Sequence, residues 1–375
     1  MKKIRYKDYY NKVFGAWLGR VVGDFIGAPV ELSSHDKIKE KYGEITDYIE
    51  PIDLTQVNDD EMYEIIALIA LEKYGIEVKA EQIALEWVNL LNREDMVFTA
   101  EKIALNNLKA QIKPPQSGTL NNVYFDFIGA QMRADIWGLI TPGCPDLAKH
   151  YAELDGSISH AGIGIEGEIF IAVLISQAFF EENIRQNINK ALQYISPEQD
   201  SLYTQMVKKS LEIYETYPND FRTARNILIR EYWLTEVLEE VINSSTILPI
   251  ERRILLNTRI GSVHVLPNIG IIILSLLYGV QDQNDPFGRS ICVAAMMGYD
   301  TDCNCGNIGA IMGVQLGADK IPAKWKDPLQ DTFTTYVEGY EKWKISELAQ
   351  RIVNVGEKVI HNKAIERISI NKKDN

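Results

Sequence analysis

The amino-acid sequence predicts an all-α protein, built as one bundle of helices around a glycine-rich buried centre. In nearly every segment the apolar residues recur with helical spacing, whereas the alternating pattern of half-buried strands is scarce. No shift in composition marks a linker, so a single domain spanning residues 1–375 is expected. The glycine-rich centre is indicated by the first predicted helix, described next.

Residues 8–28 are predicted to form this helix, with glycines at positions 15, 19, 23 and 27. A spacing of four places these glycines on one face, where another helix can approach the backbone closely. Glycine costs about 1 kcal/mol relative to alanine inside a helix, so tight packing must compensate and the helix should be central and buried. The chain leaves the helix through Glu31, whose carboxylate stands at the helix end.

Residues 33–57 contain glycine, proline and short β-branched pieces, and we expect them to form a loop. Asn58-Asp59-Asp60-Glu61 then opens an amphipathic helix that runs to residue 74. Asn58 with Glu61 three residues later is the pattern of a capping box. The oxygens at such a helix start could equally bind a metal ion, and the two interpretations are compatible.

Two further helices are predicted over residues 80–92 and 99–110, followed by a break at 114–118. Residues 128–135 are predicted to form a short apolar helix that carries Arg133 and Asp135. Two interpretations of this helix stay open. The two side chains could form a buried ion pair, or Arg133 could contact a substrate phosphate.

After a helix over residues 146–154, a loop of small residues contains His160, one of five histidines in the chain. A strongly apolar helix over residues 165–180 follows this loop. Histidines are more often structural, but a glycine-rich loop at a helix N-terminus is a good place to bind an anion. His160 is therefore a candidate binding residue. Residues 181–258 are predicted to be peripheral amphipathic helices without a chemical motif.

Predicted helices over residues 269–280 and 288–297 lead to Asp300-Thr301-Asp302-Cys303 and then to a glycine-spaced apolar run over residues 306–317. Two aspartates one residue apart, at the entry to a helix, offer hard oxygen ligands to a divalent cation. They also lie where a helix N-terminus favours negative charge, so simple acidic capping is the alternative. The last sixty residues are expected to be helical and polar.

Composition narrows the classes of function. With 39 basic and 52 acidic residues the formal net charge is −13, which argues against a nucleic-acid or anionic-membrane surface. None of the four cysteines belongs to a C-x-x-C pair, which favours a reducing compartment. Arg20 and Asp24 interrupt the first apolar segment, which argues against a signal peptide, and the longest apolar run is too short to span a bilayer. We expect a cytoplasmic protein.

The two acidic clusters and Glu31 together supply carboxylates at helix ends: Glu31, Asp59, Asp60, Asp300 and Asp302. In one cleft these groups would repel each other strongly unless cations lay among them. Oxygen ligands favour Mg²⁺, Mn²⁺ or Ca²⁺ over zinc. Two such ions about 3.5–4 Å apart could bridge a water and the vicinal hydroxyls of a sugar.

Five separated blocks of sequence, in order, resemble the ADP-ribosylglycohydrolase family over roughly residues 10 to 325. The blocks are Gly15-x-x-x-Gly19-x-x-x-Gly23-Asp24-x-x-Gly27-x-x-x-Glu31, Asn58-Asp59-Asp60, Gly129-Ala130-Gln131-Met132-Arg133, Ser159-His160 through Phe170, and Gly298-Tyr299-Asp300-Thr301-Asp302. The resemblance implies an orthogonal helical bundle with a centre of two Mg²⁺ ions, for which Mn²⁺ is an alternative. It also implies cleavage at the anomeric carbon of an ADP-ribosyl group attached to a protein or small-molecule acceptor.

The resemblance further implies roles for individual residues. Glu31 would be catalytic, positioning or activating the water, and Asp24 would act behind the metal ligands rather than among them. The metal ligands would be Asn58, Asp59, Asp60, Asp300, Asp302 and Cys303. The substrate contacts would be Gly129, Arg133, His160 and Gly162.

This chain departs from the family pattern at several positions: Asn58, Glu61 and Cys303 each stand in place of a threonine, Ala161-Gly162 in place of a second histidine, and Ile128 in place of an asparagine. A thiol is a poor ligand for Mg²⁺. Besides an ADP-ribosyl hydrolase, two alternatives therefore stay open. One is the same chemistry on a smaller ribosyl substrate such as a nucleoside, and the other is a non-catalytic relative that keeps the fold.

Overall fold

The computed structural model describes residues 1–195, 200–244 and 248–372. Its α-helices are α1 (Tyr6–Gly27), α2 (His35–Tyr42), α3 (Asp60–Tyr74), α4 (Ala80–Leu90), α5 (Thr99–Lys109), α6 (Gln116–Thr119), α7 (Gly129–Met132), α8 (Asp135–Leu139), α9 (Pro145–Gly156), α10 (Ile163–Ala178), α11 (Ile184–Ala191), α12 (Leu202–Thr216), α13 (Phe221–Asn226), α14 (Leu238–Asn243), α15 (Pro249–Leu256), α16 (Val265–Gly279), α17 (Pro286–Met297), α18 (Thr301–Leu316), α19 (Ala323–Lys326) and α20 (Ile345–Lys363). A π-helical segment, Ile227–Val237, connects α13 to α14.

The strands are β1 (Lys2–Arg5), β2 (Thr332–Thr334), β3 (Lys342–Lys344) and β4 (Ile368–Asn371). β1 pairs with β4 in parallel, with Lys2 opposite Ile368, and β2 pairs with β3 antiparallel. The expectation that the last sixty residues are helical was therefore wrong outside α19 and α20. Strands of three or four residues give too short a pattern to detect, and β4 needs a partner from the far end of the chain.

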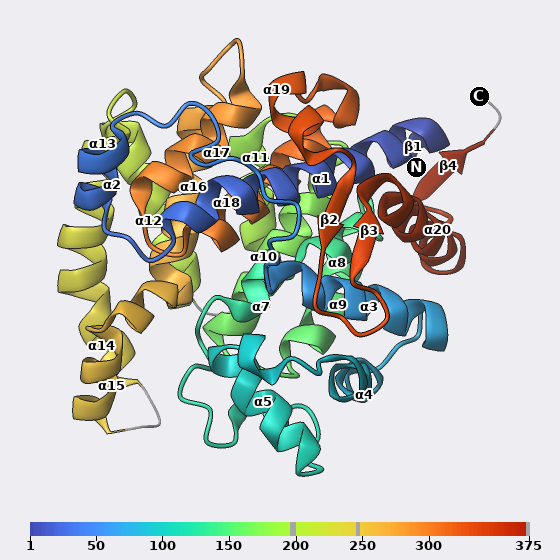
Figure 1. Cartoon of the computed structure of the whole chain (residues 1–375), viewed down its shortest axis with the longest axis horizontal. Coiled ribbons are helices and arrows are strands. Elements are labelled where there is room, and N and C mark those ends of the chain that lie inside the picture. Colours follow the sequence, from blue (N-terminus) through green and yellow to red (C-terminus); the bar gives the residue numbers. More distant parts are fainter. Residues whose placement is uncertain (196–199, 245–247, 373–375) are drawn as a thin grey trace.

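The centre of the molecule is the pair α1 and α18, which runs through the middle of Figure 1. A side chain on Gly19 would place its Cβ 1.9 Å from the carbonyl oxygen of Gly309, and one on Gly15 would lie 2.5 Å from that of Gly313. Even an alanine would collide with the partner backbone at these points. The glycine face of the first helix therefore packs as predicted, and its partner is the glycine-spaced run over residues 306–317.

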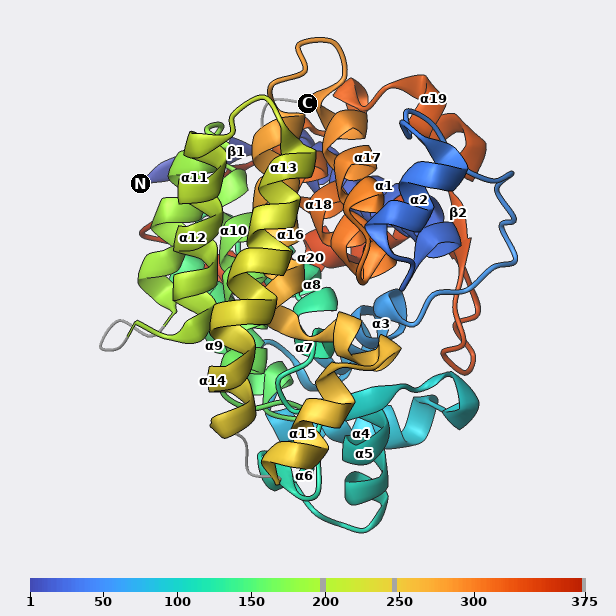
Figure 2. The same ribbon diagram turned by 90° about the vertical axis from the view of Figure 1, so that its left-hand side faces the viewer.

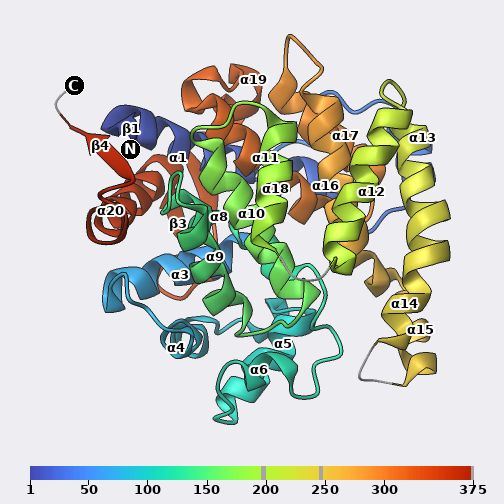
Figure 3. The same cartoon turned by 180° about the vertical axis from the view of Figure 1, so that it is seen from behind.

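The other helices enclose this pair in crossing orientations. α10, α16 and α17 pack around it, and α12 to α15 form one flank, which faces the viewer in Figure 2. α4, α5 and α6 form the lower end, and α20 with the β1–β4 sheet lies on the side opposite α12 to α15 (Figures 1 and 3). The all-α orthogonal bundle predicted from the sequence is confirmed.

One predicted loop contains a helix, α2. Its first turn is capped by the hydroxyl of Ser34, which accepts from the backbone N–H of Lys37 at 3.4 Å, and it ends at Gly43, whose φ is 63°. Only His35 and Ile38 of this helix are buried. Two buried positions are too few for apolar periodicity to reveal a helix.

By length and apolarity, α1 with the turn after it could cross a membrane, but 78% of its most apolar window is buried in the protein. Its packing against α18 accounts for the apolar composition. The bundle thus uses α1 as its core helix. The end of α1, the start of α3 and the start of α18 meet on one side of this core, and an isolated β-bridge between Val57 and Thr334 holds the segment that enters α3.

Candidate metal centre

The start of α18 presents two aspartates whose orientations are fixed by the backbone. Gly298 and Tyr299 have positive φ angles, 79° and 72°, which reverse the chain between α17 and α18. Asp300 occupies the N-cap position without making a side-chain cap, so its carboxylate is not committed to the helix end. Its backbone N–H donates to Oδ1 of Asn268 at 3.2 Å, and the hydroxyl of Thr301 donates to the carbonyl of Gly27 at 2.7 Å.

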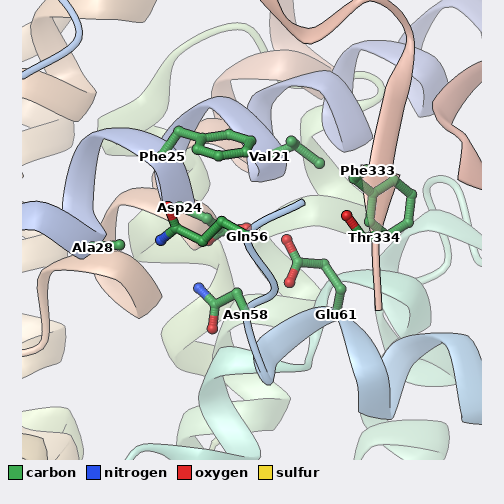
Figure 4. A pocket seen from close by; sticks show the side chains of 9 residues that line it. All are labelled: Val21, Asp24, Phe25, Ala28, Gln56, Asn58, Glu61, Phe333 and Thr334. Atoms are coloured by element: carbon green, nitrogen blue, oxygen red, sulfur yellow. The ribbon is translucent and has the colours of Figure 1, made fainter. Parts of the chain in front are cut away.

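The start of α3 does not form the predicted capping box. Asp59 occupies the N-cap position and makes no side-chain cap, while Oδ1 of Asn58 accepts from the N–H of Asp60 at 3.4 Å. Glu61 points away from this helix end into a pocket that also contains Asp24 (Figure 4). The acidic side chains of α3 are therefore available to other partners.

The structure brings the two acidic clusters together. One ligand atom from each of Asp300, Asp302 and Cys303 lies within 4.8 Å of the others. Nδ2 of Asn58 donates to Oδ2 of Asp302 at 3.4 Å, and the thiol of Cys303 donates to Oδ1 of Asp60 at 3.3 Å. Residues more than 240 positions apart in the sequence thus share one site.

This proximity shifts the pKa values of the carboxylates. Burial, and then the charge of Asp302, raises the pKa of both Asp59 and Asp300 well above its usual value. Glu31 follows a short turn at the end of α1 and is half-buried. Burial and then Asp302 raise the pKa of Glu31 to about 7, against the opposing effect of Arg259. All five predicted carboxylates therefore converge.

The carboxylates of this site are suitable ligands for a divalent cation. Oδ1 of Asp302 is buried without a hydrogen-bond partner among the residues that the structure describes. The carboxylates are close enough to raise one another's pKa, which a cation between them would reverse. Asp60 is the partial exception, since Arg20 and Cys303 contact its two oxygens at 2.9 and 3.3 Å. Oxygen ligands of this kind suit Mg²⁺ or Mn²⁺.

Arg20 is a central residue whose role the sequence did not reveal. Its guanidinium, only 1% exposed, donates to Asp60 at 2.9 Å and to Asp135 at 2.7 Å. It also lies 3.6 Å from Glu64 and 4.0 Å from Asp24. A charged residue within an apolar helix was the available signal, because such a residue needs buried partners of opposite charge.

The predicted substrate contacts Gly129 and Arg133 lie in a second buried network. Arg133 donates to Asp155 at 2.6 Å, to Glu101 at 2.8 Å and to the hydroxyl of Ser159 at 2.9 Å. A side chain on Gly129 would meet the carboxylate of Glu101. This geometry favours the ion-pair interpretation of Arg133 over contact with a substrate phosphate.

Arg133 is in buried ion pairs, but its partner is not Asp135, the residue that the ion-pair interpretation named. The single helix expected over residues 128–135 is broken between α7 and α8, and Asp135 pairs with Arg20 instead. Arg133 finds its carboxylates on α5 and α9. Sequence neighbours were therefore separated into two different ion-pair networks by the break in the helix.

His160 adjoins the Arg133 network. Its Nδ1 is 2.8 Å from the hydroxyl of Ser159, and its Nε2 is buried without a partner among the described residues. Burial and then the charge of Arg133 lower the pKa of His160 well below its usual value, so the imidazole is neutral at pH 7. Gly162, with φ of 54°, is exposed at the start of α10 and has open space around it.

Comparisons with known proteins agree with this architecture. A family model described as ADP-ribosylglycohydrolase matches residues 5–361. An uncharacterized protein from Archaeoglobus fulgidus is 26% identical over 347 residues, which cover 90% of this chain and 97% of that protein. A protein of Xenopus tropicalis named ADP-ribosylhydrolase ARH3 is 24% identical over 341 residues, covering 83% and 89%. A solved structure titled ADP-ribosylglycohydrolase-related protein complex shares the fold with a TM-score of 0.58 and 16% identity, covering 94% of this chain and 99% of that one.

Proposed function

Because the chain belongs to the ADP-ribosylglycohydrolase family, we propose that it is a divalent-metal-dependent hydrolase that removes an ADP-ribosyl group from a protein or small-molecule acceptor. The observation that carries this proposal is the convergence of carboxylates from the ends of three helices on Asp302, which retains a buried unpartnered oxygen. The similarity to a protein named ADP-ribosylhydrolase supports the choice of substrate.

In the proposed reaction, four aspartates would bind the metal ions. Asp59, Asp60, Asp300 and Asp302 would hold the metal ions, Mg²⁺ or Mn²⁺. When bound, these ions would lower the pKa of a water and orient the hydroxyls of the ribose. The fixed start of α18 keeps the aspartates in place, which limits the reorganisation needed when charge develops during the reaction.

Glu31 would act as the general base. Burial, the larger cause of its raised pKa, remains when metal ions are bound, so Glu31 would stay a better proton acceptor than an exposed glutamate. It is half-buried at the edge of the site, close enough to Asp302 for the two charges to interact. Nε2 of the neutral His160, which has no partner in the described part of the chain, would contact the substrate.

A smaller ribosyl substrate, such as a nucleoside, is the second candidate. The observation that favours it is Arg133, whose guanidinium is saturated by Glu101, Asp155 and Ser159. A guanidinium held in this way does not bind a pyrophosphate. The metal-assisted cleavage itself would be unchanged.

The test is the melting temperature of chelator-stripped protein, measured with Mg²⁺ alone and with Mg²⁺ plus ADP-ribose, adenosine or ribose. A ligand present at 100 times its Kd adds about 2.7 kcal/mol to the free energy of unfolding. We expect Mg²⁺ to raise the melting temperature and ADP-ribose to raise it further. A further rise with adenosine but not with ADP-ribose would favour the second candidate, and no response to Mg²⁺ would contradict metal-dependent chemistry.

A further inference from the structure

A small pocket lies beside the metal centre, between α1, the segment that enters α3, and β2. Its polar lining comes from Asp24, Gln56, Asn58, Glu61 and Thr334, and the rest is apolar, including Phe333. Figure 4 shows the side chains of Asp24, Gln56 and Glu61 gathered on one side of this space. The Asp24–Glu61 pair plays no part in the reaction described above.

Asp24 is 6% exposed, and apart from the Glu61 carboxylate beside it neither of its carboxylate oxygens has a hydrogen-bond partner among the described residues. Glu61, which faces it, is 4% exposed. Two carboxylates can hydrogen-bond to each other only when one of them keeps a proton. Burying both without a proton or a cation would be strongly unfavourable. The pair therefore needs either a shared proton or a cation bound between its carboxylates.

The nearest guanidinium does not supply that charge. Nη1 of Arg20 is 4.0 Å from Asp24 but donates to Asp60 at 2.9 Å, and Nη2 donates to Asp135 at 2.7 Å. Its single positive charge is thus shared mainly by two other buried carboxylates. Arg20 therefore offsets the charge of the Asp24–Glu61 pair only in small part.

The size of the pocket and the oxygen atoms that line it determine which kind of cation could bind there. Its volume of about 20 Å³ is close to the minimum of about 10–15 Å³ needed for one water molecule. This space has room for a single ion. The possible metal ligands are oxygen atoms: those of two carboxylates, the amide oxygen of Gln56 and the hydroxyl of Thr334. Such a set suits a hard divalent cation.

We propose that Asp24 and Glu61 bind a divalent cation of the Mg²⁺, Mn²⁺ or Ca²⁺ class, separate from the ions of the catalytic centre. Asn58 lies between the two sites, since it lines the pocket and donates to Asp302 at 3.4 Å. The ion holds the entrance of α3 against α1. It thereby helps to fix Asp59 and Asp60, which follow directly in the chain.

The test counts Mn²⁺ ions by electron paramagnetic resonance on the full chain after removal of metals with a chelator. The background is the double variant Asp300→Ala with Asp302→Ala, which removes ligands of the catalytic centre and makes the result independent of any hydrolysis. We expect this protein to bind one Mn²⁺ ion per chain. Adding Glu61→Gln, an uncharged side chain of the same shape, should abolish that binding, whereas adding Glu347→Gln on the exposed surface should not.

Retention of the Mn²⁺ ion after Glu61→Gln would overturn the proposal, as would the absence of any bound ion in the double variant. In the second case Asp24 and Glu61 share a proton instead. Circular dichroism establishes that each variant is folded. Asp24→Asn tests the same site from the other carboxylate, and it should remove the same ion.

Discussion

The carboxylates around Arg20 and those at the start of α18 are equally buried but differ in what neutralises them. The first group surrounds a guanidinium of the chain itself, which approaches Asp60 and Asp135 within hydrogen-bonding distance. The second group, Asp300 and Asp302, has no guanidinium or ammonium at salt-bridge distance among the described residues, and one oxygen of Asp302 is unpartnered. Asp60 lies between the two groups and contacts both, through Arg20 and Cys303.

This difference indicates that the Arg20 group stabilises the fold, whereas the Asp300–Asp302 group serves metal binding and catalysis. An internal guanidinium is always present, so the Arg20 group can hold α1, α3 and α8 together in every state of the protein. A group without an internal cation depends on one from solution, and its charge is available for chemistry. Changes in the first group should therefore affect the free energy of unfolding, and changes in the second should affect metal binding and turnover.

The largest effect is expected from Asp300→Ala combined with Asp302→Ala. Hydrolysis should fall by about 10²- to 10³-fold, the range seen when a main electrostatic stabiliser of a transition state is removed. The helical content measured by circular dichroism should not change, because α18 is held by its glycine packing against α1. Turnover that survives in this variant would contradict the metal-dependent mechanism.

Arg20→Met tests the other side of the comparison. Removing one partner of a buried ion pair typically costs about 3–5 kcal/mol, because the remaining charges are left uncompensated. Urea denaturation should show a loss of that order in the free energy of unfolding. The matched control is Arg93→Met, whose exposed pair with Asp95 should contribute little to the free energy of unfolding. Equal effects of the two substitutions would mean that the Arg20 group does not hold the core.

The pH dependence of the metal-free protein sharpens the comparison. Glu31 has a pKa of about 7 in the folded state and 4.5 ordinarily, so between these values the folded state binds more protons than the unfolded state. The free energy of unfolding should therefore fall as the pH rises from 4.5 to 7. Mg²⁺ prefers deprotonated carboxylates, so the stabilisation it gives should grow over the same range.

Melting temperatures measured across this pH range, with and without Mg²⁺, check the prediction. The Asp300→Ala, Asp302→Ala variant is the control, and both slopes should be smaller in it because Asp302 raises the pKa of Glu31. A Mg²⁺ stabilisation that decreases with rising pH would show that the cation does not bind at these carboxylates.

The smallest effect is expected from Cys303→Thr. The thiol of Cys303 contacts Asp60 and reaches Sδ of Met132 at 3.7 Å, so it lies between the metal centre and the core. A threonine hydroxyl is a better Mg²⁺ ligand than a thiol. Calorimetric titration should therefore show Mg²⁺ affinity that is equal or higher. A large loss of affinity would assign the thiol a role of its own, and Cys303→Ser would then distinguish the size of the side chain from its chemistry.

Much of this protein could be predicted from short patterns. The glycines of α1, spaced by four, indicated a helix that another helix approaches closely. Asp59, Asp60, Asp300 and Asp302 were identified because adjacent acidic residues at helix starts are a local signal. The all-α class followed from helical periodicity, which is repeated in many long segments. The short helix α2 and the strands, β4 among them, were missed because they carry too few periodic positions.

What the sequence by itself determined is the helical class, the close-packing face of α1 and the residues that could bind a metal ion. Only the tertiary structure decided which charges meet. Arg133 pairs with Asp155 and Glu101 rather than with Asp135, and Arg20 gathers carboxylates from α3 and α8. The strength of these interactions depends on distance and burial in space, and neither quantity can be obtained from positions along the chain.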